Sequence, residues 1–154
     1  MPERIYFAGI DETRAALKEL GDIESTREFK AAGKAVANDV VIPAARAEAA
    51  GWGRLQERAA ETLKAASIAT GGALRFGGGF AAALGAEFGA MRDQRRNTAR
   101  GVVYGWNQFL PWRGSSGDAG YFLWPAIRQE APAIVEKYAT ELGPLWKRLF
   151  PEEG

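Results

Sequence analysis

The sequence predicts an α+β fold: a small, mostly antiparallel sheet packed by a long helix of the N-terminal half and by a C-terminal helix. Apolar residues recur at helical spacing between Phe29 and Val40, and again between Ile127 and Leu149. Short apolar runs broken by glycines, typical of strands and turns, lie between these two stretches. We expect residues 1–154 to form a single domain, since this length suffices for one core and no linker composition interrupts it.

The first fifty residues are predicted to be mainly helical. A short edge strand is expected over residues 4–10, and a helix over residues 12–20 is expected to follow it. A second helix is predicted to begin at Ser25, the first residue of a capping box. Pro43 removes a backbone donor, so we expect a kink or a break just before it, with the helix resuming as far as Ala50.

Shorter elements are predicted in the middle of the chain. A helical run over residues 56–66 is expected to precede a β-hairpin over residues 67–76, with Gly71 and Gly72 in its turn. A third strand is expected over residues 80–88. The three glycines at 77–79 lack the sequence context of a phosphate-binding loop, so we interpret them as a turn that uses glycine's conformational freedom.

The C-terminal third is predicted to be a long amphipathic helix. Pro125 suits its first turn, Pro132 is expected to kink it or to mark its true first turn, and Gly143 with Pro144 is expected to interrupt it. Its apolar face would consist of Ile127, Ala131, Ile134, Tyr138, Leu142, Leu145 and Leu149.

Missing residue types restrict the possible chemistry more than the composition does. The chain contains no cysteine and no histidine, which removes thiol nucleophiles, thiolate metal sites and the usual general base near neutral pH. An enzyme would have to rely on carboxylates such as Asp11, Glu12 or Glu87, and no pair of acids lies in a motif that implies converging geometry. We therefore expect no catalysis, no cofactor and no metal.

Charge and hydropathy give weak indications about partners. The 20 basic and 19 acidic residues leave a net charge of +1, which does not by itself indicate a nucleic-acid-binding protein. No apolar run approaches the roughly 20 residues that a membrane-spanning helix needs. The N-terminal residues show no secretion signal, so we expect synthesis in a cytoplasm and no membrane partner.

Two loops between residues 91 and 124 are the candidate functional segments. Arg92, Arg95, Arg96 and Arg100 face only one acid, Asp93, and form either a solvated loop or a phosphate-contacting surface. The following loop is rich in aromatic rings, which must pack on something: they either cover the protein's own core or form an assembly surface. These rings belong to Trp106, Phe109, Trp112, Tyr121, Phe122 and Trp124.

Three blocks in this region resemble matching blocks of a siphophage family. The blocks are residues 84–90 (LGAEFGA), 109–114 (FLPWRG) and 120–128 (GYFLWPAIR). The family comprises small neck (head–tail connector) and minor tail-component proteins, many from phages of actinobacteria, and the order and spacing of the blocks match as well. Residues 53–55 also match the Gly-Arg-Leu of a Thr-Gly-Arg-Leu motif, with Trp52 in place of the threonine.

The resemblance implies a structural virion protein of the neck or tail. It implies a homo-oligomeric ring, sixfold or twelvefold, that contacts adjacent connector, terminator or tail proteins. DNA would pass through the lumen without sequence specificity, facing Arg92, Arg95, Arg96 and Arg100. The subunit interface would use Phe109, Pro111, Trp112, Arg113, Tyr121, Phe122 and Trp124.

Two further expectations concern the loops. The Arg113 guanidinium is expected to pair with a carboxylate or a carbonyl group, in its own chain or in the next subunit. The alternative function is a small nucleic-acid-binding module, in which the arginine loop contacts phosphates and aromatic rings stack on bases.

Overall fold

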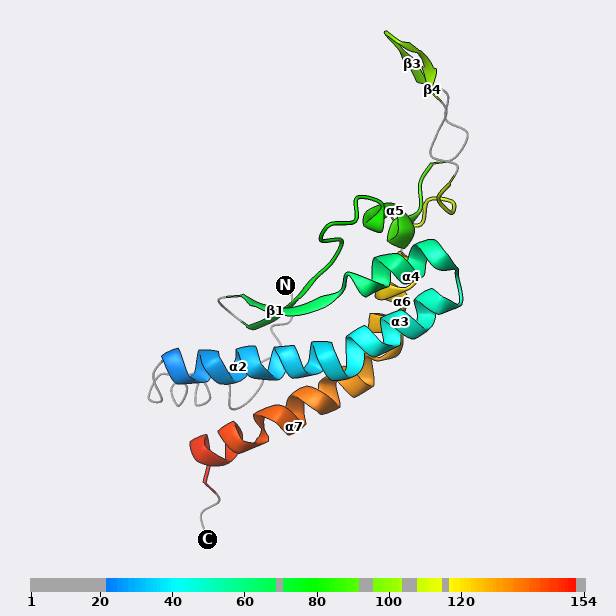
Figure 1. Cartoon of the computed structure of the whole chain (residues 1–154). Coiled ribbons are helices and arrows are strands. Elements are labelled where there is room, and N and C mark those ends of the chain that lie inside the picture. The colour runs from blue at the N-terminus through cyan, green and yellow to red at the C-terminus, as the bar shows by residue number, and fades with distance from the viewer. Residues whose placement is uncertain (1–21, 69–70, 92–95, 104–107, 115–116, 152–154) are drawn as a thin grey trace, which may run out of the picture.

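The computed structural model describes residues 22–68, 71–91, 96–103, 108–114 and 117–151 (Figure 1). Its helices are α2 (Asp22–Val36), the π-helical turn η1 (Ala37–Val41), α3 (Ile42–Ala50), α4 (Arg54–Glu61), α5 (Ala83–Phe88), α6 (Leu123–Gln129) and α7 (Ala131–Leu149). Its strands are β1 (Lys64–Ile68), β2 (Gly71–Arg75), β3 (Arg96–Thr98) and β4 (Gly101–Val103).

These elements confirm the predicted α+β class, including the long helical run and the C-terminal helix. The strands form two separate antiparallel hairpins, β1–β2 and β3–β4. The strand expected over residues 4–10 and the helix expected over 12–20 lie outside the described residues.

Helix α2 lies between the β1–β2 hairpin and helix α7 (Figure 1). Glu28 of α2 pairs with Arg148 of α7 at 2.6 Å, and Asp39 of η1 pairs with Lys137 at 3.0 Å. Because the partner's number falls as the chain advances, the two helices run antiparallel. The apolar side chains buried between them are Ala32, Leu142 and Leu145.

The long helical run passes Pro43 by widening just before it. The N–H of Ile42 donates to the carbonyl of Ala37, five residues earlier, which is the π-helical pattern. Pro43 then lies in the first turn of α3, where a missing N–H costs little. The predicted kink or break therefore takes the form of a π-helical turn with helix on both sides. The predicted start at Ser25 is wrong, because α2 already includes Asp22.

The hairpin rests on α2 through a contact between two glycines. A Cβ added to Gly33 of α2 would lie 2.5 Å from the Gly72 nitrogen, and one added to Gly72 would lie 2.6 Å from the Gly33 carbonyl carbon. The prediction that Gly71 and Gly72 form the turn is wrong. Ile68 pairs with Gly71, so both glycines belong to β2. Gly72 is there because the helix and the strand approach too closely for any side chain.

The third predicted strand, over residues 80–88, is also wrong, since its second half forms helix α5. Ala83, Ala86 and Glu87 are buried at the three- and four-residue spacing of a helix face. The basic loop instead contains strands, β3 and β4. A predicted interruption of the C-terminal helix is absent: α7 continues through Pro144 to Leu149, while Pro132 does lie in its first turn.

The core between α3, α4, α5 and α6 is built mainly from small side chains. Half of the fourteen buried residues in this cluster are alanines. Alanine faces let helices approach closely, but they remove little apolar surface from water per residue. Phe122, Leu63, Leu145 and Glu87 are the largest fully buried side chains among the described residues, and Glu87 is the only charged one of the four.

The contact between Gly33 and Gly72 predicts that substitutions at two neighbouring glycines change the stability of the protein by very different amounts. Gly72→Ala should lower the free energy of unfolding by about 1–3 kcal/mol, because the added methyl group forces α2 and β2 apart. Gly71→Ala should change it by less than about 0.5 kcal/mol, since a Cβ at Gly71 meets nothing within 4 Å. Urea denaturation of both variants measures the difference, and equal midpoints would show that the contact does not limit packing.

Candidate assembly surface

A buried carboxylate connects the first sequence block to the third. Glu87 lies in the last turn of α5 and is fully buried. Its Oε2 accepts hydrogen bonds from the N–H groups of Phe122 at 3.1 Å and Leu123 at 2.9 Å, and its Oε1 accepts one from Trp124 at 2.9 Å. The side chain of Glu87 therefore caps the N-terminus of α6.

With this cap, every main-chain N–H group at the N-terminus of α6 has a hydrogen-bond acceptor. The first N–H groups of an α-helix have no partner inside the helix and must find one elsewhere. Here the carboxylate takes three of them, and the next residue, Pro125, has no N–H to satisfy. The N–H of Ala126 makes the first intrahelical bond, to the Phe122 carbonyl at 3.1 Å. A negative charge at this end is also favoured by the helix dipole.

The second block runs beside the end of α5 and joins it through the main chain. The N–H of Ala90 donates to the Leu110 carbonyl at 2.9 Å, and the N–H of Arg113 donates to the Phe88 carbonyl at 2.7 Å. Gly89, with φ of +74°, has no room for a side chain, because an added Cβ would lie 2.5 Å from the Leu110 oxygen. Residues 84–90 and 109–114 therefore fold as one piece.

Tyr121 ties the third block to the second. Its main-chain N–H donates to the Glu87 carbonyl at 2.8 Å, and its hydroxyl donates to the Pro111 carbonyl at 2.6 Å. The edge of its ring meets Trp52, with 5.0 Å between the ring centroids. The three blocks that carry the family resemblance thus form a single structural unit, which we call the Glu87 unit (residues 84–90, 109–114 and 120–128).

Arg113 makes a different contact within the chain from the one predicted, and a carboxylate or carbonyl of a neighbouring subunit stays a prediction. Its guanidinium carbon lies 5.2 Å from the Tyr121 ring centroid, in a cation–π arrangement. Within the described residues no carboxylate or carbonyl pairs with this guanidinium. The carboxylate of the same unit, on Glu87, is already surrounded by three main-chain N–H groups and is closed to solvent.

The residues predicted for a subunit interface divide into two groups. Phe109, Tyr121 and Phe122 are buried within the chain itself, and Phe109 packs so closely on Gly85 that an added Cβ would lie 2.5 Å from its ring. These rings cover the protein's own core. Trp112 is 48% exposed and Trp124 is 45% exposed. The remaining members, Pro111 and Arg113, are also exposed.

Two further exposed apolar residues of this region were missed by the sequence analysis. Leu84 is 65% exposed and Met91, which directly follows the first block, is 55% exposed. With Trp112 and Trp124 they make up half of the eight large hydrophobic side chains that are exposed among the described residues. The exposure of Leu84 was missed because residues 80–88 were predicted to form a strand, whereas Leu84 lies in helix α5.

Met91 and Trp112 each directly follow one of two bridged residues. Ala90 and Pro111 form an isolated parallel bridge, and the side chains of the two residues that follow them are both about half exposed. The Trp112 ring also lies 6.3 Å from the ring of Phe88, measured between centroids. The outer side of the Glu87 unit is therefore apolar around Trp112.

The predicted basic surface is only partly described. Arg96 begins β3, and the exposed Arg100 lies in the turn between β3 and β4, whereas Arg92 and Arg95 lie outside the described residues. Figure 1 shows this hairpin at one end of the molecule, beyond α5.

Other site chemistries gain no support from the described part of the chain. Of the three carboxylates considered for catalysis, Asp11 and Glu12 lie outside it, and Glu87 serves as the helix cap. The described residues include no group of three or more His, Cys, Asp or Glu side chains that could hold a metal ion. They also include no helix long and apolar enough to cross a membrane.

Comparison of this chain with models of protein families, with curated proteins and with solved structures found no match.

The cap predicts that an isosteric substitution is costly. In Glu87→Gln the amide group would place N–H donors against the main-chain N–H groups, so one or more buried donors would lose their acceptor. We expect the free energy of unfolding to fall by about 1.5–3 kcal/mol. Glu136→Gln, at an exposed position of α7, is the control and should change it by less than about 0.5 kcal/mol. Calorimetry of both variants measures the two changes in stability. Equal stability of the two variants would refute the role of Glu87 as a helix cap.

Proposed function

We propose that this protein is a structural component of a tailed-phage virion, forming part of the neck or of a tail-completion ring through which DNA passes. The observation that carries the proposal is the Glu87 unit. The three blocks that resemble the siphophage family are not scattered matches: they contact one another through main-chain hydrogen bonds and a shared buried carboxylate.

The surface of this unit supports a role in assembly. Four of the eight exposed large hydrophobic side chains lie in the unit or directly beside it. Aromatic residues and methionine are enriched where proteins meet. The alanine-rich core leaves the chain with few large buried side chains of its own, so contacts with neighbouring subunits would add apolar burial that the core alone lacks.

The β3–β4 hairpin, which carries Arg96 and Arg100 and which we call the arginine hairpin, supports a lumen that faces DNA. One copy carries only a small positive surface, but a ring would repeat it around the axis and create a belt of positive charge. Arginine offers a fixed fork of donors to phosphate oxygens, and such contacts are independent of base sequence. This matches DNA that moves through a channel without being read.

The apolar surface around Trp112 predicts an assembly defect. Trp112→Ala should raise the concentration needed for ring formation at least about tenfold, as expected for an aromatic residue at the centre of an interface. Trp112→Phe, which keeps a ring beside Phe88, is the control and should assemble much closer to the parent protein. Sedimentation velocity measures assembly, and circular dichroism confirms the fold. Normal ring formation by the alanine variant would contradict this role.

The arginine hairpin predicts a defect in DNA handling with little change in the fold. Replacing Arg92, Arg95, Arg96 and Arg100 together by serine should leave thermal stability nearly unchanged and reduce DNA retention in assembled particles. Replacement of the four by lysine keeps the charge and should restore most of the retention. Particles of the serine variant that package and eject DNA normally would remove the support for a DNA-facing hairpin.

Light scattering of the purified protein, followed by cryo-electron microscopy of particles that contain it, tests the function itself. A ring, or density for the chain in a phage neck, is expected. A strict monomer that binds DNA with a strong salt dependence would instead favour the nucleic-acid-binding module.

A further inference from the structure

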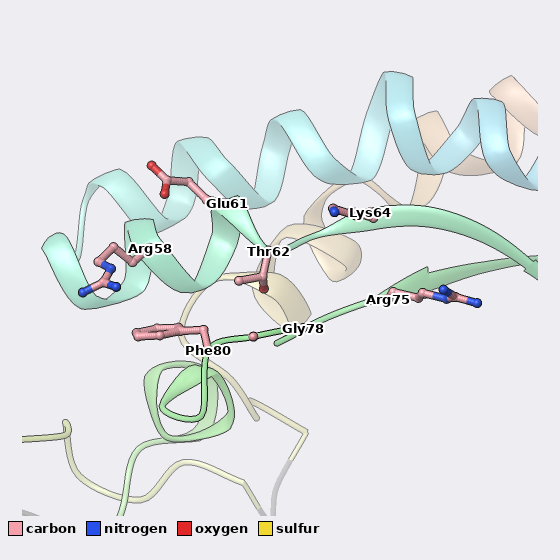
Figure 2. Close-up of a pocket in the computed structure, with 8 residues that line it drawn as sticks. Arg58, Glu61, Thr62, Lys64, Arg75, Gly78 and Phe80 are labelled. Atoms are coloured by element: carbon pink, nitrogen blue, oxygen red, sulfur yellow. The ribbon is translucent and has the colours of Figure 1, made fainter.

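An open groove at the end of α4 carries a second group of positive charges. The groove has a volume of about 470 Å³ and is lined by the end of α4, by strands β1 and β2, and by the segment that follows β2 (Figure 2). Volumes of this size are typical of small-molecule and cofactor sites. None of its lining residues belongs to the Glu87 unit or to the arginine hairpin.

The charge of this groove is unbalanced. Arg58, Lys64 and Arg75 line it, with Glu61 as the only acid. These four side chains sum to +2, whereas the whole chain has a net charge of +1. Within the described residues, neither Lys64 nor Arg75 makes an ion pair.

Two of these cations also lie at paired positions of the two neighbouring strands. Lys64 and Arg75 are partners in the β1–β2 ladder. Like charges at directly opposed positions destabilise an antiparallel pair. An anion bound in the groove would offset the repulsion between the two cations. The strands β1 and β2 contain no acidic residue that could offset this repulsion instead.

Two glycines of the turn after β2, Gly78 and Gly79, line the same groove. Gly77 is anchored, since its N–H donates to the Thr62 hydroxyl at 2.8 Å, and that hydroxyl donates to the Ala59 carbonyl at 2.6 Å. The next two N–H groups, of Gly78 and Gly79, make no hydrogen bond to any described residue. A Cβ built at either glycine meets nothing within 4 Å, so a ligand can approach the backbone closely. Unpaired main-chain N–H groups in such turns are favourable sites for anions.

The cations are spread along the groove rather than gathered at one point. Figure 2 shows Arg58 and Phe80 towards the α4 end, Lys64 and Thr62 in the middle, and Arg75 farther along the hairpin. Arg58 is held there by its position over the Phe80 ring, 4.9 Å from the centroid. This spacing suits an extended ligand with more than one negative group better than a single compact anion.

We propose that this groove binds a ligand with linked phosphate groups, through Arg58, Lys64, Arg75 and the N–H groups of Gly78 and Gly79. Phosphate is favoured over carboxylate because arginine forks and main-chain N–H groups together match its several acceptor oxygens. A nucleoside diphosphate and a nucleic-acid backbone share this chemistry. The proposal does not rest on the role in a phage neck, since it concerns the isolated chain and residues outside the Glu87 unit.

The test uses the full chain and two probes, pyrophosphate and a short oligothymidylate, titrated by calorimetry at low and near-physiological salt. The double variant Lys64→Thr with Arg75→Thr should weaken binding at least about tenfold, because two charge-assisted contacts are lost. The matched control, Arg46→Gln with Arg128→Gln, removes the same charge from exposed positions outside the groove and should weaken it less than about twofold. In amide NMR spectra, the Gly78 and Gly79 signals should shift on addition of the bound probe.

The outcomes separate the sources of phosphate and can overturn the proposal. Groove-dependent binding of pyrophosphate indicates a small phosphate ligand, and groove-dependent binding of the oligonucleotide alone indicates a nucleic-acid backbone. Absence of binding by both probes, equal losses in the two double variants, or equally tight binding of polyglutamate would overturn it. If the threonine variant does not fold, Arg58→Gln alone provides the same comparison.

Discussion

The buried carboxylate of Glu87 is the interaction on which the rest of the structure depends. An ionised side chain without solvent contact is strongly unfavourable unless hydrogen bonds replace its water. Here the replacements come from three consecutive N–H groups, and they hold α5 and α6 at one separation and one orientation. The same requirement explains Gly120, with φ of +86°, because a Cβ there would collide with the Glu87 carboxylate.

Fixing α6 in this way orders the elements around it. Phe122, just before the helix, is fully buried and meets Phe76 across the core with 5.9 Å between ring centroids. Helix α6 leads directly into α7, which runs back along η1 and α2 and makes one ion pair with each of them. One local cap thereby links the middle of the chain to its C-terminal helix.

The Glu87 unit contains both buried and exposed aromatic residues. Phe109, Tyr121 and Phe122 face inward, whereas Trp112 and Trp124 remain almost half exposed. Aromatic residues that lie close together in the sequence thus play opposite roles. Two groups of cations also lie on separate elements of the fold: Arg96 and Arg100 belong to the β3–β4 hairpin, and Arg58, Lys64 and Arg75 line the groove beside β1 and β2.

The sequence by itself determined the features that depend on neighbours a few residues away. The apolar stripes of α2 and α7, the role of Pro132 and the existence of a hairpin near residue 70 follow from spacing and local backbone restrictions. Only the tertiary structure decided that residues 83–88 are helical, that Gly72 serves packing rather than a turn, and that Glu87 caps a helix. The cap joins residues 35 to 37 positions apart, and the glycine contact joins a helix to a strand. Such contacts arise from the packing of whole elements, which no periodicity in the sequence encodes.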